Sequence, residues 1–358
     1  MSELEKYNKT IHICSKCGLC QASCPIYKIT GNDCTVSRGM FIMLDGVLKN
    51  KLKMNNNINR YLDLCLKCNA CANNCPSGIN IVNVLFAAKS EYFNNHPLEK
   101  IVSYIQKKLI YGLFLNILEK FAVKTKSAKF KRKVLYFSGC GAKITGNKSV
   151  IKIMNNIGIE VLTPNFSCCG IHLLIRGDIN GFREYINNFI KILKQFEQTE
   201  IVTNCATCEK ILKEYSNWVE QDEDKEFLQK LSVRNVYSYL KEANFILELQ
   251  NKHLVTYHKP CNINNMNDIE WILHNTKNLH YVKMENFDEC CGFSGITNLK
   301  EYSIMKNVFM KKRNNIIKTN TKTVLTSCLA CKIALNMYSL NRYKADDLLD
   351  FLFKNLKK

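Results

Sequence analysis

The chain has 358 residues, 46% of them hydrophobic, which fits two or three domains with cores of their own. It has no uncharged apolar stretch of about 18 residues or more, so we expect no transmembrane helix. The opening MSELEKYNKT lacks the apolar core of a signal peptide, so we expect a cytoplasmic protein. Its formal charge of +20 comes with no nucleic-acid recognition motif, and we expect no nucleic-acid partner.

Nineteen cysteines are too many for an ordinary chain in a reducing compartment and indicate metal binding more than disulfides. Eight of them form two runs with the spacing C-x2-C-x2-C-x3-C, each closed by a proline. The runs are Cys14, Cys17, Cys20 and Cys24, then Cys65, Cys68, Cys71 and Cys75. This is the spacing of bacterial ferredoxins that hold two four-iron cubane clusters.

In this spacing the first three cysteines wrap one cluster and the fourth reaches the other. Cluster 1 is therefore assigned to Cys14, Cys17, Cys20 and Cys75. Cluster 2 is assigned to Cys65, Cys68, Cys71 and Cys24. The alternative is a pair of structural zinc sites, but zinc ligands usually come as separated pairs, and a colourless protein after anaerobic purification would be needed to favour it. The insert between the runs is expected to be helical.

The segment Ile101–Phe121 has an apolar side, and the basic run Lys124–Lys133 follows it. The residues of that side are Ile101, Ile105, Leu109, Leu113 and Ile117. We favour a linker helix that packs between domains, with a solvated basic loop after it. The alternative is peripheral contact with the inner face of the membrane, where an amphipathic helix and basic residues meet anionic lipid.

Ten further cysteines form a pattern that occurs twice. The first copy is Cys140, Cys168, Cys169, Cys205 and Cys208, and the second is Cys261, Cys290, Cys291, Cys328 and Cys331. Corresponding cysteines are 121, 122 or 123 residues apart, which indicates an internal duplication. Cys34 belongs to neither set, and we interpret it as an incidental, packed thiol.

Short apolar runs recur in each copy and predict strands. They are Val134–Phe137, Ile159–Leu162 and Ile201–Thr203, then Leu254–Tyr257, Leu279–Val282 and Thr323–Thr326. Helical-length stretches separate them, so each copy should form a small, mostly parallel sheet with cysteines at the strand ends. The fold class is thus α+β overall. We expect a helical ferredoxin-type domain at 1–95, a helical and basic linker at 96–133, and duplicated α/β domains at 134–250 and 251–358.

The repeats resemble the cysteine-rich CCG domains of heterodisulfide reductase and of the iron–sulfur subunits of glycolate- and lactate-oxidising complexes. The order of parts resembles the glycolate oxidase iron–sulfur subunit in particular. The supporting stretches are Cys24–Tyr27, Ser37–Gly39, Cys75–Gly78, Cys168–His172, Tyr257–Cys261, Cys290–Gly295 and Thr297–Asn298.

This resemblance implies that five cysteines of a CCG domain hold a noncubane four-iron cluster. Both copies keep all five, so one or two further clusters are implied, and the complete sets lean toward the disulfide-reducing relatives. His172 and His258 lie beside these cysteines in the sequence. We favour packing or hydrogen bonding for both, and the alternative is that they tune a cluster or deliver protons.

No Rossmann fingerprint or Walker loop occurs, so this chain is not expected to bind a nucleotide cofactor itself. The resemblance implies an oxidoreductase subunit that takes electrons from an FAD-linked flavoprotein oxidising glycolate, lactate or another 2-hydroxy acid. The cubane pair would pass them to an acceptor at the CCG domains, either a quinone, a disulfide or another carrier. The alternative is a heterodisulfide reductase-like thiol/disulfide oxidoreductase. A degenerate scaffold is a third hypothesis, and the complete ligand sets argue against it.

Overall fold

The computed structural model describes residues 1–115, 130, 132–140, 148–166, 168–263, 265–295 and 300–357. The chain forms two compact bodies, which are described separately. The N-terminal body comprises Met1–Lys107, Gly170–Phe182 and Glu289–Arg313. The C-terminal body comprises Lys108–Cys169, Arg183–Asp288 and Asn314–Lys358. Among the described residues, none of the helices has the length and apolar character needed to cross a membrane.

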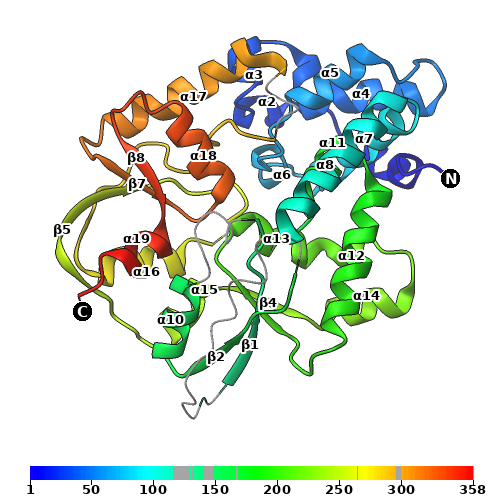
Figure 1. The fold of residues 1–358 in the computed structure, drawn as a ribbon. Helices are drawn as coiled ribbons and strands as arrows, with labels where there is room; N and C mark the ends of the chain where they lie inside the picture. The colour runs from blue at the N-terminus through cyan, green and yellow to red at the C-terminus, as the bar shows by residue number, and fades with distance from the viewer. Residues whose placement is uncertain are drawn as a thin grey trace. The chain divides into compact units, whose positions relative to one another are not determined.

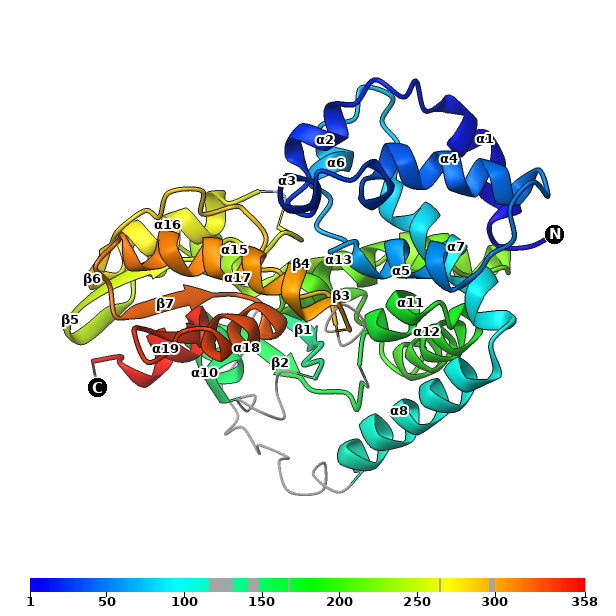
Figure 2. The same ribbon diagram turned by 90° about the horizontal axis from the view of Figure 1, so that it is seen from above.

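The N-terminal body is built from helices, several of them short (Figure 2). They are α1 (Asn8–Ile13), α2 (Leu19–Ser23), α3 (Tyr27–Thr30), α4 (Ser37–Leu48), α5 (Asn56–Leu64), α6 (Ala70–Asn73), α7 (Ile81–Asn94), the first part of α8 (Pro97–Leu115) and α11 (Ile171–Arg176), with 3-10 turns at Glu5–Tyr7 and Asp33–Thr35. Asn55 and Asn80 start α5 and α7, because each side chain accepts a hydrogen bond from a backbone N–H three residues later. The insert between the cysteine runs is largely helical, as expected.

An apolar core lies under the cysteine loops of this body. Met40, Phe41 and Leu44 of α4 and Val84 and Leu85 of α7 are almost fully buried in it. The partly buried cysteines that pack against this core are Cys14, Cys65, Cys71 and Cys75. The helices therefore hold the cysteine loops on a rigid apolar base.

Helix α8 makes polar contacts on one side and leaves apolar residues exposed on the other. Ser103 donates a 2.6 Å hydrogen bond to Asp178, and Arg176 forms a 2.5 Å ion pair with Glu99. Ile101 and Ile105, on the predicted apolar side, are 54% and 50% exposed, and the packing of this side between domains stays a prediction. Leu109, Leu113, Ile117 and most of the basic run lie outside the residues whose side chains are described.

The C-terminal body holds two four-stranded sheets (Figure 1). The first contains β1 (Arg132–Tyr136), β2 (Ile159–Leu162), β3 (Glu200–Thr203) and β4 (Ser232–Asn235), in the order β2-β1-β3-β4. The second contains β5 (Glu248–Tyr257), β6 (Lys277–Tyr281), β7 (Thr323–Thr326) and β8 (Lys344–Asp347), in the order β6-β5-β7-β8. Every named pair is parallel. The predicted α+β class and the duplicated parallel sheets are confirmed.

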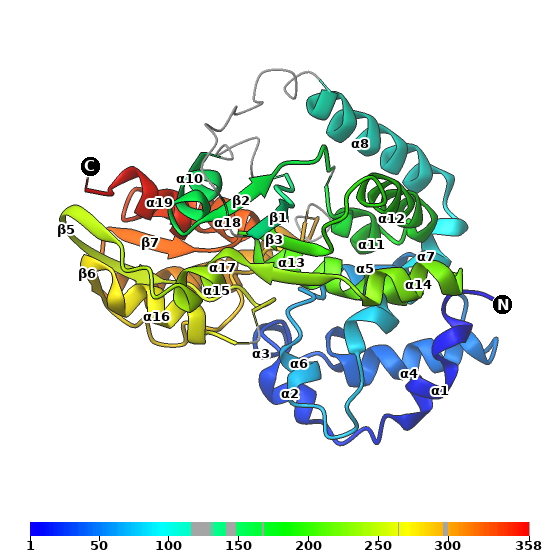
Figure 3. The same cartoon turned by 90° about the horizontal axis from the view of Figure 1, so that it is seen from below.

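Helices join the strands of both repeats (Figure 3). They are α10 (Lys148–Asn156), α12 (Ile179–Leu193), α13 (Ala206–Glu214), a 3-10 turn at Tyr215–Asn217, α14 (Asp222–Gln229), α15 (Val236–Glu242), α16 (Asn267–Asn275), α17 (Tyr302–Ile317), α18 (Leu329–Met337) and α19 (Leu348–Lys354). Within this body α10 packs against α19, and α15 packs against α16. Since α10 and α15 of the first repeat correspond to α16 and α19 of the second, the repeats exchange equivalent contacts around one shared core. Strand β5 begins at Glu248, just before the boundary expected at residue 250.

Candidate iron–sulfur sites

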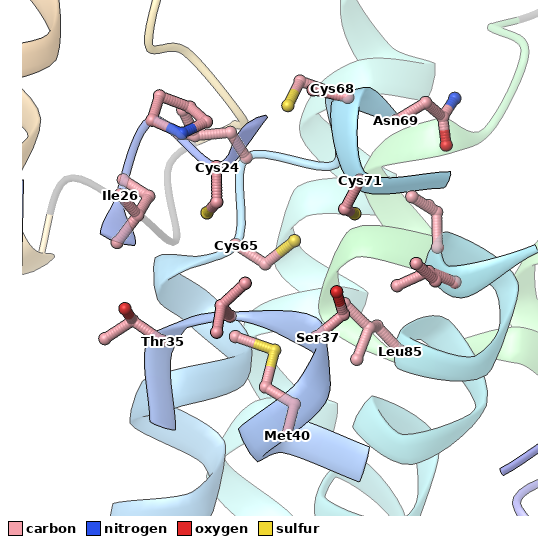
Figure 4. A pocket seen from close by; sticks show the side chains of 16 residues that line it. Cys24, Ile26, Thr35, Ser37, Met40, Cys65, Cys68, Asn69, Cys71 and Leu85 are labelled. Carbon is pink, nitrogen blue, oxygen red and sulfur yellow. The ribbon is translucent and has the colours of Figure 1, made fainter. Parts of the chain in front are cut away.

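The pocket of the second cysteine run is lined by Cys65, Cys68 and Cys71 together with Cys24 of the first run. Figure 4 shows the four sulfur atoms around one hollow, with Met40 and Ser37 of α4 at its base. Cys65 lies directly after the last residue of α5. Lys67 and Asn69 have φ of 53° and 59°, a left-handed conformation that curls the short loop around the hollow.

A second pocket is lined by Cys14, Cys17 and Cys20 together with Cys75 of the second run. Cys71 also borders it. Cys14 follows the last residue of α1, and Gly18, with φ of 86°, turns the loop as Lys67 and Asn69 do in the other run. Cys24 and Cys75 thus lie where the exchanged assignment requires them. Their roles as ligands of clusters 2 and 1 stay a prediction.

The chemistry of the second-run pocket fits a cationic metal centre. Burial, together with the nearby Cys65 and Cys68, raises the pKa of Cys24 to about 12. Burial and the same two neighbours also raise the pKa of Cys71. Four thiolates in such a pocket repel one another and lose hydration, so they need bound positive charge to be stable together. Iron bound to all four sulfurs would supply that charge.

Cys68 differs from its neighbours because it contacts the second CCG repeat. A hydrogen bond from the Cys290 thiol lowers the pKa of Cys68 to about 7, against the effect of burial. Cys290 lies in the Glu289–Arg313 segment, which belongs to the N-terminal body. The same segment is tied to α5 by Arg60 and Glu301, whose Nη2 and Oε2 atoms are 2.9 Å apart. The cysteine pair at 290–291 is therefore anchored beside the cluster 2 loop.

The five cysteines of the first repeat are brought together at the carboxyl ends of β1 and β3. Cys140 donates a hydrogen bond to Cys168, and this bond together with burial raises the pKa of Cys140. Cys208 is hydrogen-bonded to both Cys169 and Cys205, and these bonds raise its pKa. Cys205 immediately precedes α13, and Cys208 lies in its first turn. All five belong to the C-terminal body, as a shared metal centre would require.

Gly139 is needed beside these thiols. Its φ is +55°, and a Cβ at this position would lie 2.9 Å from the sulfur of Cys208. Any side chain here would combine an unfavourable backbone conformation with a clash against a candidate ligand. The backbone next to Cys140 therefore lies so close to the thiols that only glycine fits at this position.

The CxxC motifs of the two repeats meet inside the C-terminal body. A hydrogen bond from Cys205 to Cys328 lowers the pKa of Cys328 and raises that of Cys205. The Thr207 hydroxyl is 3.4 Å from the Cys328 sulfur, and Asn262 donates a 3.0 Å hydrogen bond to that hydroxyl. The N-termini of α13 and α18 thus face each other. The sequence placed these motifs in separate domains and carried no signal of this contact.

The cysteines of the second repeat are divided between the bodies. Cys261, Cys328 and Cys331 belong to the C-terminal body, whereas Cys290 and Cys291 belong to the N-terminal one. Cys331 is hydrogen-bonded to Cys328. The structure therefore shows a contact between Cys328 and Cys331. That all five cysteines of the second repeat bind one cluster stays a prediction.

The remaining candidates have distinct surroundings. The His258 side chain is fully buried, and one of its ring nitrogens lies within 4.8 Å of the Cys331 sulfur. Burial and then the charge of Arg176 lower the pKa of His172 to about 4, so this ring is neutral at physiological pH. Cys34 is partly buried in the turn before α4 and lines neither pocket of the cysteine runs.

Comparison with known proteins finds a family match for each of the three cysteine sets. Residues 10–79 match the family model of the 4Fe-4S dicluster domain, and residues 134–213 and 255–336 match that of the cysteine-rich domain. The probable glycolate oxidase iron-sulfur subunit of Bacillus subtilis is 24% identical, over 90% of this chain and 88% of its own length. The glycolate oxidase iron-sulfur subunit of Escherichia coli is 22% identical, over 91% and 89%.

A third relative is one of the subunits of the dihydromethanophenazine:CoB–CoM heterodisulfide reductase of Methanosarcina acetivorans, 22% identical over 93% of this chain and 90% of its own length. Among solved structures, a hypothetical protein from Helicobacter pylori covers 99% of this chain and 72% of its own, with 12% identity and a TM-score of 0.46. The matched domains hold all eight cysteines of the two runs and all ten of the repeats. The chain therefore belongs to the iron–sulfur proteins that join one 4Fe-4S dicluster domain to two cysteine-rich CCG domains.

Proposed function

We propose that the chain is the electron-transfer subunit of an oxidoreductase complex whose FAD-linked flavoprotein partner oxidises a 2-hydroxy acid of the glycolate or lactate type. Relatives that match over about nine-tenths of the chain are named as glycolate oxidase iron-sulfur subunits. Others, which match about half of it, are named lactate utilization protein A. Iron–sulfur clusters supply single-electron storage and transfer, which connects a two-electron flavin to a separate acceptor.

The contact between Cys68 and Cys290 carries this proposal. The eight cysteines of the two runs hold the cubane clusters 1 and 2, and the CCG cysteines hold one or two noncubane clusters. Because the Cys290 thiol is hydrogen-bonded to a cluster 2 cysteine, a ligand of the ferredoxin-type domain touches a candidate ligand of the second CCG repeat. Such a contact supports electron delivery from the cubane pair to the CCG domains, where a quinone, a disulfide or another carrier accepts them.

The test is anaerobic mixing of the iron-loaded chain with its flavoprotein partner. Adding glycolate or lactate should bleach the visible absorbance of the clusters, and a mixture without the flavoprotein should not respond. Failure of every 2-hydroxy acid to reduce the clusters would contradict the proposal. The iron content of the chain shows which clusters contribute to the spectra. About eight iron atoms per chain would mean that only the cubane clusters are present, and about twelve or sixteen would mean one or two CCG clusters in addition.

A second candidate function is disulfide reduction at the CCG domains. It is favoured by the contact between Cys205 and Cys328, which brings the CxxC motifs of two complete cysteine sets together. The relatives include the heterodisulfide reductase protein of Methanosarcina acetivorans and one of the subunits of the fumarate reductase (CoM/CoB) of Methanothermobacter marburgensis, 21% identical over 96% of this chain. Cluster spectra that change when a thiol or disulfide is added would support this function, and indifference to both would count against it.

The proposed location is the cytoplasm, with peripheral contact at the inner face of the membrane through α8. Among the residues of this helix whose side chains are described, Leu98, Ile101, Val102 and Ile105 are apolar, exposed and recur at helical spacing. Co-sedimentation with vesicles that contain anionic lipid tests the contact. Binding should weaken when Ile101 and Ile105 are both changed to Ser, and a holoprotein that stays in the supernatant at low salt would contradict it.

A further inference from the structure

Two lysines occupy equivalent positions in the cysteine runs but have opposite environments. Lys16 precedes Cys17, and Lys67 precedes Cys68. Both have left-handed backbones, with φ of 57° and 53°. Lys16 is exposed to solvent, whereas only 8% of Lys67 is exposed. The two loops therefore differ in where they place a positive charge: one in water, the other in the protein interior.

Lys67 has no ion-pair partner among the residues that the structure describes. Its Nζ donates a 3.2 Å hydrogen bond to the carbonyl oxygen of Leu62, and its backbone N–H donates to the sulfur of Cys65 at 3.4 Å. Across the part of the chain that the structure describes, no carboxylate oxygen is found within 4.0 Å of this Nζ. Lys67 is thus a buried cation whose ammonium group donates to a neutral carbonyl and whose backbone contacts the sulfur of a candidate cluster ligand.

The other buried lysine of this region is balanced. Lys89 is 3% exposed, and its Nζ lies 2.6 Å from Asp63 Oδ1 and 2.5 Å from Asn59 Oδ1. Lys89 and Asp63 together add no net charge. Of these two buried lysines, only Lys67, which stands between the candidate ligands Cys65 and Cys68 in the chain, keeps a positive charge without an ion-pair partner.

An isolated ammonium group in the interior is costly unless an opposite charge compensates it. A four-iron cluster bound by four thiolates is an anion, and it becomes more negative when it accepts an electron. The attraction between Lys67 and the cluster is therefore stronger in the reduced state, and low polarity around both groups enlarges the difference. Water screens the charge of Lys16, so cluster 1 gains little from the equivalent residue.

We propose that Lys67 raises the reduction potential of cluster 2 above that of cluster 1, so that an electron shared by the pair resides mainly on cluster 2, beside Cys290. This inference rests on the cubane assignment of the proposed function. Lys67 would act through its charge on the cluster, without binding iron, and Lys16 would have no such effect. Neither a bond nor a proton moves in this step, and in a titration dithionite supplies the single electron that each cluster accepts.

The test is an anaerobic redox titration of the iron-loaded full chain, followed by electron paramagnetic resonance. Lys67→Met removes the charge and keeps the length of the side chain, and Lys67→Gln is a second neutral variant in case the first loads poorly. Lys67→Arg retains the charge. Lys16→Met is the matched control, because it makes the same change at the exposed equivalent position.

The two cubane clusters of the wild type should show two different midpoint potentials. Lys67→Met and Lys67→Gln should move only the higher one to more negative values, while Lys67→Arg and Lys16→Met leave both unchanged. Neutral variants that shift neither midpoint, only the lower one, or both equally would overturn the inference. A wild-type chain without four-iron signals would instead contradict the proposed function, so the two failures are distinguishable.

Discussion

The thiol of Cys290 donates a hydrogen bond to the sulfur of Cys68, which joins the second CCG repeat to the second ferredoxin run. In the metal-free chain this bond should make Cys68 the most reactive of the four cluster 2 cysteines. The hydrogen bond lowers the pKa of Cys68 to about 7, whereas burial raises those of Cys65 and Cys71 and raises that of Cys24 to about 12. Since the thiolate is the nucleophile, alkylation of Cys68 should increase through pH 7 and lead that of the other three.

Mass spectrometry of tryptic peptides after brief iodoacetamide treatment measures this order. Cys290→Ala removes the donor, so the pH at which Cys68 becomes half reactive should rise. Cys17 is a useful reference because it is exposed and its pKa is lowered by the backbone N–H of Leu19, independently of Cys290. Faster labelling of Cys24 or Cys71 than of Cys68 would contradict the described contact.

Exchange of the fourth ligand between the runs gives a second prediction. Cys24→Ala should remove cluster 2 although Cys24 belongs to the first run, because Cys24 lines the pocket of Cys65, Cys68 and Cys71. Cys75→Ala should remove cluster 1 for the corresponding reason. Each variant should lose about four iron per chain and one of the two cubane signals. Cys34→Ala, the control, should lose neither.

Six strands could be predicted from apolar runs, but β4 and β8 could not. Their sequences, Ser232–Asn235 and Lys344–Asp347, are polar, and only Val233 and Ala345 are buried in them. These strands lie at the edges of their sheets, so most of their side chains contact water or helix ends and leave no hydrophobic pattern. Their formation depends on pairing with β3 and β7, which is a tertiary effect.

The candidate ligands could be predicted from spacing, whereas their contacts across motifs could not. Cysteine spacing reports which residues share a loop. The hydrogen bonds from Cys205 to Cys328 and from Cys290 to Cys68 depend on how helices pack, and neither partner has a local sequence signal for the other. The difference between Lys16 and Lys67 is of the same kind, since identical positions in two similar runs differ only in what covers them.

The buried pair of Lys89 and Asp63 leads to a prediction about stability. Lys89→Met leaves the Asp63 carboxylate buried without its cation and should lower the free energy of unfolding by about 3–5 kcal/mol. Changing Asp63 to Leu in the same chain should recover most of that loss, because the unpaired charge is removed as well. Urea denaturation measures both effects. Lys49→Met is the control: Lys49 pairs with Asp45 on the surface, and the cost should stay within about 1 kcal/mol.

Asp347 leads to a prediction about pH. It caps α19 by accepting hydrogen bonds from the backbone N–H groups of Leu349 and Asp350, and Asn235 caps α15 in the same way at the equivalent position of the first repeat. Burial, followed by repulsion from Asp350, raises the pKa of Asp347 from 3.8 to about 7. Between these pH values the folded chain holds a proton that the unfolded chain releases, so this group makes the fold less stable as the pH rises through that range.

Asp347→Asn keeps the capping oxygen and removes the charge, as Asn235 already does in the first repeat. The variant should therefore be more stable than the wild type at pH 8, by a free energy of unfolding on the order of 2 kcal/mol, and the gain should shrink as the pH falls below 7. Asp346→Asn should instead lower the free energy of unfolding at neutral pH. Although burial opposes it, the ion pair with Lys332 holds the pKa of Asp346 below its usual value, so this carboxylate stabilises the fold at neutral pH. Urea midpoints at pH 6, 7 and 8 separate the two variants, and a stability difference between Asp347→Asn and the wild type that does not change with pH would show that Asp347 is ionised in the fold throughout.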